Sequence, residues 1–381
     1  MNNSLTNDNN AKQQKQHKVR DPLFQIVKRD GLEWYKALGI RLGAILIALV
    51  VCALVLVLLT NMLGTPYNPI KIYKTMFDGA FGSARKTWVT MQDVAMLLCV
   101  SLAVTPAFKM KFWNIGAEGQ TLIGGLCAAI CMRYLGPALP DFLTIPIMAV
   151  ACIVSGALWA IIPAFFKAKF NTNETLFTLM LNYVAMQIIK IFIAIWVPTG
   201  SGVLSRIDNA HLPILFGQKQ LLNILVVAIL TVIMYIYMRY SKQGYEISVV
   251  GESENTAKYI GINVKKVIIR TMAISGAVCG IAGLLLVAGR DYTVSAATAG
   301  GMGFTAIMVS WLAKFNPFVM PLTSFLIVFL ERGASEMASR LRLNESISDV
   351  VTGIIIFFII GCEFFVNYKI LFRHGKHNKE V

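Results

Sequence analysis

Long apolar runs alternate along the chain with short polar segments that carry most of its lysines and arginines. As a helix, an apolar run of about 20 residues can cross the ~30 Å hydrocarbon core of a membrane. Ten segments fit this pattern, one of them short: residues 38–62, 92–108, 111–134, 142–166, 171–198, 221–237, 270–288, 304–313, 318–335 and 347–367. The pattern predicts an all-α polytopic membrane helix bundle with about ten transmembrane segments.

Two of these segments are broken or short. The third opens with a stretch at residues 111–121 that contains two glycines and several polar residues. Residues 290–314 contain the glycine-rich run GGMG and then a helix barely half as long as a span. Broken helices at matching places in two oppositely oriented halves indicate a substrate path where the halves meet.

The basic residues predict the orientation of the bundle. Lys28, Arg29, Lys36 and Arg41 precede or open the first segment, so we expect the N-terminus to be cytoplasmic. In the ten-segment topology, the predicted inner segments hold roughly twice as many lysines and arginines as the outer ones. Both termini are therefore expected to be cytoplasmic.

Three regions follow from this topology. Residues 1–37 form a cytoplasmic N-terminal tail, which we expect to be largely disordered because its start is polar and lacks periodicity. Residues 38–367 form the transmembrane domain, which includes a cytoplasmic loop at 243–266. Residues 368–381 form a basic cytoplasmic tail.

Polar residues at the first break are candidates for a substrate path. Asn114 and Glu118 are four residues apart and share one helix face, and Gln120 follows. A carboxylate inside a bilayer costs about 2.5–3.5 kcal/mol, so it usually faces a cavity, a pore or a bundle interior. The alternative is that the acid caps the start of its own helix.

A second polar stripe runs along the fifth segment, where Glu174, Thr178 and Asn182 recur at intervals of four. It can line the path or form a hydrogen-bonded seam between two helices, which is common in membranes. Near the second break, Phe304 is a further candidate for the path. Trp113 and Trp311 could stack on a ligand or anchor the helices at the interface.

The cytoplasmic loop contains a short, well-capped helix in the segment GESENTAKYIGI, residues 251–262. Ser253 is a good N-cap, and Gly261 is a natural residue just past the C-terminus. About two helical turns are too short to be stable alone in water, so this helix must dock on something. The partner is either another subunit or the chain's own bundle.

The composition of the chain excludes several classes of function. Hydrophobic residues make up 56% of the chain and charged ones 14%, against about 25% charged residues in ordinary soluble domains. The net charge of +15 comes from basic residues beside apolar runs, not from a soluble basic domain, so we expect no nucleic-acid partner. No GxxxxGK[ST] motif or catalytic constellation is present, so an enzyme is not expected and any ATP would bind another subunit. An ion-coupled secondary transporter is a weaker alternative, because few charged residues lie within the apolar runs.

Three stretches resemble the membrane permease subunits of bacterial ABC importers for nucleosides, which are relatives of the ribose and branched-chain amino-acid permeases. They are FWNIGAEGQ at 112–120, NTNETLFTLMLNY at 171–183, and the loop segment at 251–262. The resemblance implies a multi-pass translocation subunit in the bacterial cell membrane, with no cofactor of its own. It also implies an ATP-binding cassette subunit, an extracytoplasmic substrate-binding protein and a second permease, identical or homologous, as partners in the lipid membrane. A simple-sugar permease of the ribose type is the alternative.

These considerations give two sets of expected site residues. The substrate path is expected to involve Asn114, Glu118, Gln120, Thr178, Asn182 and Phe304. The contact with the ATPase is expected to involve Glu252, Ser253, Thr256, Ala257, Tyr259, Ile260 and Gly261. The segment ERGASE at 331–336 is more charged than in the resembled permeases, and we expect Glu331 and Arg332 to form only a local pair.

Overall fold

The computed structural model describes residues 24–29, 33–62, 68–198 and 202–372. The chain divides into two compact units. The larger unit covers residues 66–352, and the smaller joins residues 1–65 to residues 353–381. Most of the predicted N-terminal tail and the end of the basic C-terminal tail lie outside the described residues.

The described chain is almost entirely helical, as predicted. The helices of the larger unit are α3 (Pro69–Phe81), α4 (Ala84–Lys109), α5 (Ala117–Ile130), α6 (Asp141–Phe170), α7 (Glu174–Trp196), α8 (Leu221–Tyr240), α9 (Lys242–Glu252), α10 (Glu254–Tyr259), α11 (Val264–Leu286), α12 (Met302–Leu312) and α13 (Met320–Arg340). Two π-helical turns, η1 (Cys131–Leu135) and η2 (Val287–Asp291), continue α5 and α11. Helix α2 (Trp34–Met62) belongs to the smaller unit, and α14 (Glu345–Asn367) runs from the larger unit into the smaller one.

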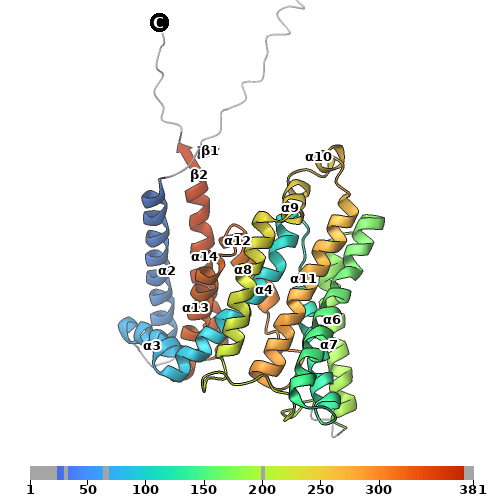
Figure 1. Ribbon diagram of the computed structural model, residues 1–381. Helices are drawn as coiled ribbons and strands as arrows, with labels where there is room; N and C mark the ends of the chain where they lie inside the picture. Colours follow the sequence, from blue (N-terminus) through green and yellow to red (C-terminus); the bar gives the residue numbers. More distant parts are fainter. Residues whose placement is uncertain (1–23, 30–32, 63–67, 199–201, 373–381) are drawn as a thin grey trace, which may run out of the picture. The chain divides into compact units, whose positions relative to one another are not determined.

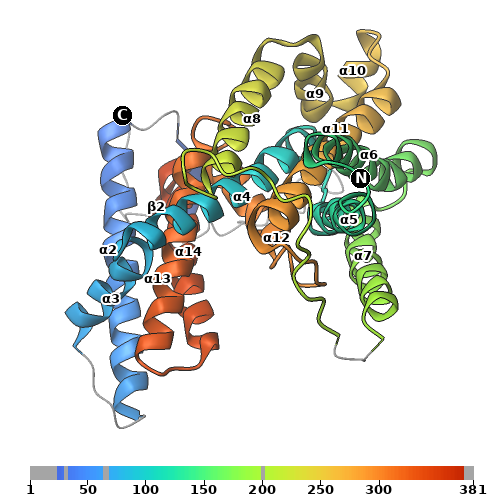
Figure 2. The ribbon, with the colours of Figure 1, turned by 60° about the horizontal axis from the view of Figure 1, so that its bottom comes forward.

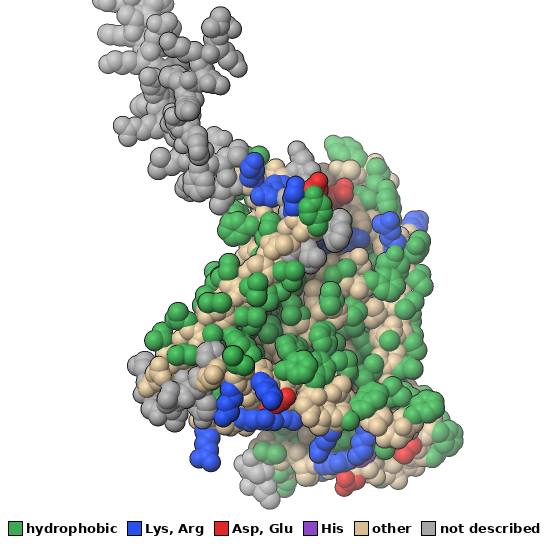
Figure 3. All heavy atoms as spheres, turned by 90° about the vertical axis from the view of Figure 1, so that its left-hand side faces the viewer, with side chains coloured by type: hydrophobic (Ala, Val, Ile, Leu, Met, Phe, Trp, Pro, Cys, Tyr) green, Lys and Arg blue, Asp and Glu red, His purple; other side chains and the backbone are tan. Residues whose placement is uncertain are grey.

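Seven of the described helices are long and apolar enough to cross a membrane: α2, α4, α6, α7, α8, α11 and α14. Together with the short helices α5 and α12 and the more charged α13, they coincide with the ten predicted segments. In the space-filling view, hydrophobic side chains cover the middle of the face, and lysines and arginines lie toward its two ends (Figure 3). The prediction of an all-α polytopic membrane bundle is confirmed.

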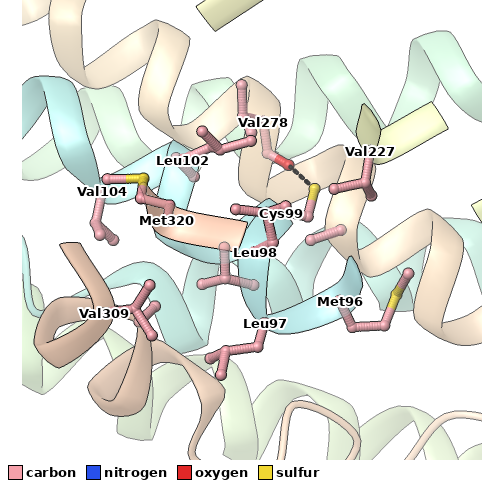
Figure 4. Close-up of a cluster of buried hydrophobic side chains, with 14 of the residues drawn as sticks. Met96, Leu97, Leu98, Cys99, Leu102, Val104, Val227, Val278, Val309 and Met320 are labelled. Atoms are coloured by element: carbon pink, nitrogen blue, oxygen red, sulfur yellow. Dashed lines mark hydrogen bonds between the residues drawn. The ribbon is translucent and has the colours of Figure 1, made fainter. Parts of the chain in front are cut away.

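Helix α4 lies at the centre of the larger unit, in contact with α8, α11, α12 and α13. Every residue from Gln92 to Phe108 is buried. Val227 of α8, Val309 of α12 and Met320 of α13 pack around it (Figure 4). Burial on all sides explains why this helix is apolar around its whole circumference.

Glycines let α11 approach α6 at backbone distance. A Cβ atom on Gly156 of α6 would overlap the carbonyl oxygen of Gly276 and lie 3.0 Å from the Cα of Gly280. Helix α11 meets α5 in the same way, since a Cβ on Gly124 would lie 2.7 Å from the Cα of Gly280. The small-residue face of α11 thus makes the close helix packing that its glycine spacing indicates. Figure 2 shows α5, α6, α7 and α11 side by side.

Two short strands of the smaller unit were not predicted. Strand β1 (Phe24–Lys28) pairs antiparallel with β2 (Tyr368–Phe372), within the two regions assigned to the tails. In the same unit, the guanidinium of Arg41 lies 2.6 Å from the carboxylate of Glu363. The two ends of the transmembrane region are thereby joined by backbone hydrogen bonds and an ion pair.

Candidate functional site

The chain breaks between α4 and α5, as predicted. Helix α4 ends at Lys109, and Lys111 has a positive φ of 59° that turns the backbone out of the helix. Helix α5 begins only at Ala117, so residues 110–116 are irregular backbone between the two helices. Such backbone is tolerated at membrane depth only where protein groups or water satisfy its polar atoms.

The side chain of Asn114 satisfies several of these polar atoms. It is fully buried, and its Oδ1 accepts hydrogen bonds from the backbone N–H of Gly116 (3.0 Å) and from Nε2 of Gln120 (3.1 Å). Its Nδ2 donates to Oγ of Ser275 on α11, at 3.1 Å. One amide therefore ties the break to the start of α5 and to α11.

Helix α7 holds the other side of the break through the predicted polar stripe. Thr178 Oγ1 accepts a hydrogen bond from the N–H of Ile115 at 3.2 Å. The Asn182 amide accepts from the N–H of Gly119 and donates to the carbonyl of Ile115, both at 2.9 Å. Glu174, at the start of the stripe, pairs instead with Lys167 at 2.9 Å. In this conformation the stripe is a hydrogen-bonded seam between α5 and α7.

Glu118 joins the two broken regions. Its Oε1 accepts a hydrogen bond from the N–H of Gly301 (2.8 Å) and its Oε2 from the N–H of Gly303 (2.7 Å). These amides open α12, where unpaired N–H groups and the helix dipole favour a negative charge. Glycine is required at 303, because a Cβ there would lie 2.5 Å from the backbone nitrogen of Glu118. The predicted alternative, in which the acid caps the start of its own helix, is wrong, because Glu118 binds the amides at the start of α12 and α5 has no side-chain cap.

The expected path residues therefore lie together, with one exception. Asn114, Glu118, Gln120, Thr178 and Asn182 are at most 2% exposed and hydrogen-bonded within the protein. Their role in lining a path stays a prediction, because the hydrogen bonds by themselves describe a structural core.

The exception is Phe304, which is 46% exposed on α12. Trp113 and Trp311 are also about half exposed, and their ring centroids lie 5.5 Å apart. The two rings are tilted at 51° to each other and pack with Phe108, whose ring centroid is 5.7 Å from that of Trp113.

A polar cavity of about 620 Å³ lies beside the second break. Gly300, Met302 and Thr305, at the start of α12, form one side of it. Residues of α4, of η2 and of α13 form the others. The volume falls within the ~300–1,000 Å³ that ligand pockets occupy. The hydrogen bonds to Glu118 hold the backbone amides at the start of α12, which forms this side of the cavity.

An ion cluster lines the same cavity. Asp93 of α4 pairs with Arg290 of η2 at 3.4 Å and with Nε of Arg332 of α13 at 2.6 Å. Arg290 also pairs with the adjacent Asp291 at 2.8 Å. The prediction that Arg332 forms only a local pair with Glu331 is wrong, because α13 packs against α4 and brings the guanidinium to Asp93.

Sequence reasoning missed the importance of Asp93 and Arg290. Each lies near the end of an apolar run, where charged residues usually indicate the membrane interface. The sequence did contain a signal, which is the number of charged residues near the predicted outer ends of the segments. They are Asp93, Arg290, Asp291, Glu331 and Arg332.

At the opposite end of the larger unit, α9 and α10 form the predicted cytoplasmic loop (Figure 1). Ser253 caps α10 by accepting a hydrogen bond from the N–H of Thr256 at 3.2 Å, and Gly261 has a positive φ of 83°. Ala257 is fully buried in the bundle, whereas Tyr259 is 91% and Ile260 54% exposed. Ala257, which we expected at the contact with the ATPase, is therefore not on the exposed surface of the loop.

Helix α9 touches the end of α4 directly before the first break. A Cβ atom on Gly251 would overlap the carbonyl oxygen of Lys109. Val250 and Ala257 belong to the same buried cluster as Met110 and Phe112. The loop and the broken stretch are therefore in direct packing contact.

A polytopic helix bundle with two broken helices meeting in its interior, beside a polar cavity, has the architecture of a membrane transport protein. The family model for the permease component of branched-chain amino acid transport systems matches residues 89–360. The chain belongs to this permease family and is a multi-pass membrane protein. The family membership predicted from the three motifs is confirmed.

Three relatives are similar over most of their length. The guanosine ABC transporter permease protein NupP of Bacillus subtilis is 29% identical over 84% of this chain and 92% of its own. The nucleoside ABC transporter permease protein NupB of Lactococcus lactis is 30% identical over 78% and 85%. The glucose ABC transporter permease protein TsgB13 of Haloferax volcanii is 27% identical over 91% and 93%. No solved structure matches the chain.

Proposed function

We propose that the protein is the membrane translocation subunit of an ATP-driven ABC importer for nucleosides. It works with separate ATP-binding cassette and extracytoplasmic substrate-binding subunits and with a second permease. The observation that carries the proposal is the similarity over most of the chain to permeases named for guanosine and for nucleosides. The relative named for glucose makes a simple sugar the second candidate substrate.

Uptake into proteoliposomes tests this function. The permease is reconstituted with its ATPase and binding protein, and labelled guanosine and glucose are supplied in turn. We expect guanosine uptake that requires ATP and is unaffected by proton and sodium ionophores. Uptake of glucose alone would make the sugar the substrate, and uptake abolished by an ionophore in the presence of ATP would indicate an ion-coupled transporter.

The contacts support a route from the ATPase side to the cavity. Helix α9 packs against the end of α4 at Gly251, and residues 110–116 follow directly. The Asn114 network holds this stretch, and Glu118 connects it to the start of α12 at the cavity. A contiguous set of packed and hydrogen-bonded groups of this kind can carry coupling between two sites.

The exposed side chains of α10 are the surface we assign to the ATPase. Tyr259→Ala should weaken recovery of the ATPase with the permease at least about tenfold, because a tyrosine that becomes buried at an interface is commonly an energetic anchor. Co-purification at graded ATPase concentrations measures this. The matched control is Ile233→Ala, at a 53% exposed apolar position on α8. If both variants recover the same amount of ATPase, the surface that contacts the ATPase lies elsewhere.

A further inference from the structure

Three acidic and two basic side chains line the cavity beside α12. Its charged lining residues are Asp93, Asp291, Glu331, Arg290 and Arg332. Both guanidinium groups are already paired, Arg290 with two carboxylates and Arg332 with Asp93. A bound anion would have to separate these pairs while facing a third carboxylate, which is costly in a site partly shielded from water.

The third carboxylate, Glu331, is exposed and faces the cavity from α13. Among the described residues, it has no hydrogen bond or ion pair. An ionised carboxylate is an acceptor only, and its two oxygens can receive two hydroxyl donors at once. The vicinal hydroxyls of a ribose or of a hexose present that pair of donors.

We infer that this cavity is a binding site for neutral polyhydroxylated substrates, in which Glu331 accepts the vicinal hydroxyls and the closed ion cluster excludes phosphorylated forms. The inference rests on the proposed function and deepens it, since nucleosides and simple sugars share this chemistry. Gln92 and Ser335 line the cavity as further polar groups, and Met302 and Val328 provide apolar surface for the rest of the ligand.

The start of α12 gives the site a way to respond to the other subunits. Gly300, Met302 and Thr305 form one side of the cavity, and Glu118 holds the amides of Gly301 and Gly303. A shift of α5 is therefore transmitted to the cavity lining. Binding and release of the ligand follow the position of α12.

Protection of a single reactive thiol tests the inference on the purified permease–ATPase complex, without the binding protein. Ser335→Cys puts an exposed thiol on the cavity lining, and the unsubstituted protein, whose cysteines are buried or half-buried, serves as the blank. The rate of alkylation by N-ethylmaleimide is measured against rising uridine, uridine 5′-monophosphate, 2′,3′-dideoxyuridine and glucose. We expect uridine to slow alkylation, and the monophosphate and dideoxy compounds to require at least about tenfold higher concentration.

Two variants in the Ser335→Cys background assign the effect to Glu331. Glu331→Gln should raise the half-protecting uridine concentration at least about tenfold, because it removes the charge and one acceptor oxygen. Glu336→Gln is the matched control, since Glu336 pairs with Lys86 at 2.7 Å and is not part of the cavity lining. Unliganded alkylation rates equal to that of the parent show that the cavity is intact in each variant.

The outcomes distinguish the proposed binding site from the proposed import of nucleosides. Equal protection by uridine and its monophosphate, an unchanged response in Glu331→Gln, or no protection by uridine or glucose would overturn the inference. Protection by glucose but not by uridine, with the same Glu331 dependence, would keep the polyol site and refute nucleosides as the substrate.

Discussion

Glu118→Gln is expected to lower transport at least about tenfold and to destabilise the folded bundle by about 1.5–3 kcal/mol, the contribution of a buried hydrogen bond to a charged group. Each carboxylate oxygen accepts a backbone N–H of α12. A glutamine side chain keeps one acceptor oxygen for one backbone N–H. Its NH₂ group faces the other N–H, so two hydrogen-bond donors meet at that position. ATP-dependent uptake and thermal unfolding of the purified permease measure the two effects.

Glu174→Gln is the matched control, because Glu174 is also an acid in the first turn of a helix. Its pair with Lys167 is 2.9 Å long and partly exposed, and such pairs contribute only about 0–1 kcal/mol. Glu118→Asp, which keeps the charge but shortens the side chain, should fall between the wild type and Glu118→Gln. If Glu118→Gln unfolds and transports like the wild type, the link between α5 and α12 is not needed.

Gly156→Leu is expected to prevent assembly of a stable bundle. The first side-chain atom already overlaps the carbonyl of Gly276, so α6 and α11 must separate along the length of their contact. Overpacking of a core typically costs about 1–3 kcal/mol and more when the obstacle is backbone, which cannot move aside as a side chain can. Size-exclusion chromatography and thermal unfolding in detergent provide the measurement.

Gly353→Leu in α14 makes the same chemical change where space is open. No atom lies within 4 Å of a Cβ at this position. Leucine also has a higher helix propensity than glycine, by about 1 kcal/mol, so this variant should be neutral or slightly more stable. Equal behaviour of the two variants would show that the α6–α11 crossing tolerates separation.

The ten segments and both breaks could be predicted because their signals are local. A membrane span has a required length, and a glycine cluster next to polar residues interrupts an apolar run wherever it occurs. The glycines of α11 that contact α6 and α5 are a local signal of the same kind, since they recur along one side of a single helix. The short strands β1 and β2 gave no such signal, because their pairing depends on bringing residues 24–28 close to residues 368–372.

Part of the candidate site could be found from the sequence, but its contacts could not. Asn114, Glu118 and Asn182 attract attention as polar residues in apolar surroundings, whether they line a path or join two helices. The partners of Glu118 are backbone N–H groups 183 and 185 residues away, and every residue except proline offers one. Asp93 and Arg332 are 239 residues apart, and each taken alone is an ordinary charge near the end of a span.

The long sequence separation between Glu118 and Gly301 bears on how the protein is made. Helix α5 carries a carboxylate in its first turn that lipid does not accept. The ribosome must add about 180 further residues before the amides that receive this carboxylate exist. We therefore expect α5 not to enter the lipid as an independent span during synthesis. We expect it to stay beside α4 and α7 until α12 is made, so that membrane insertion of this region is completed after translation of both halves.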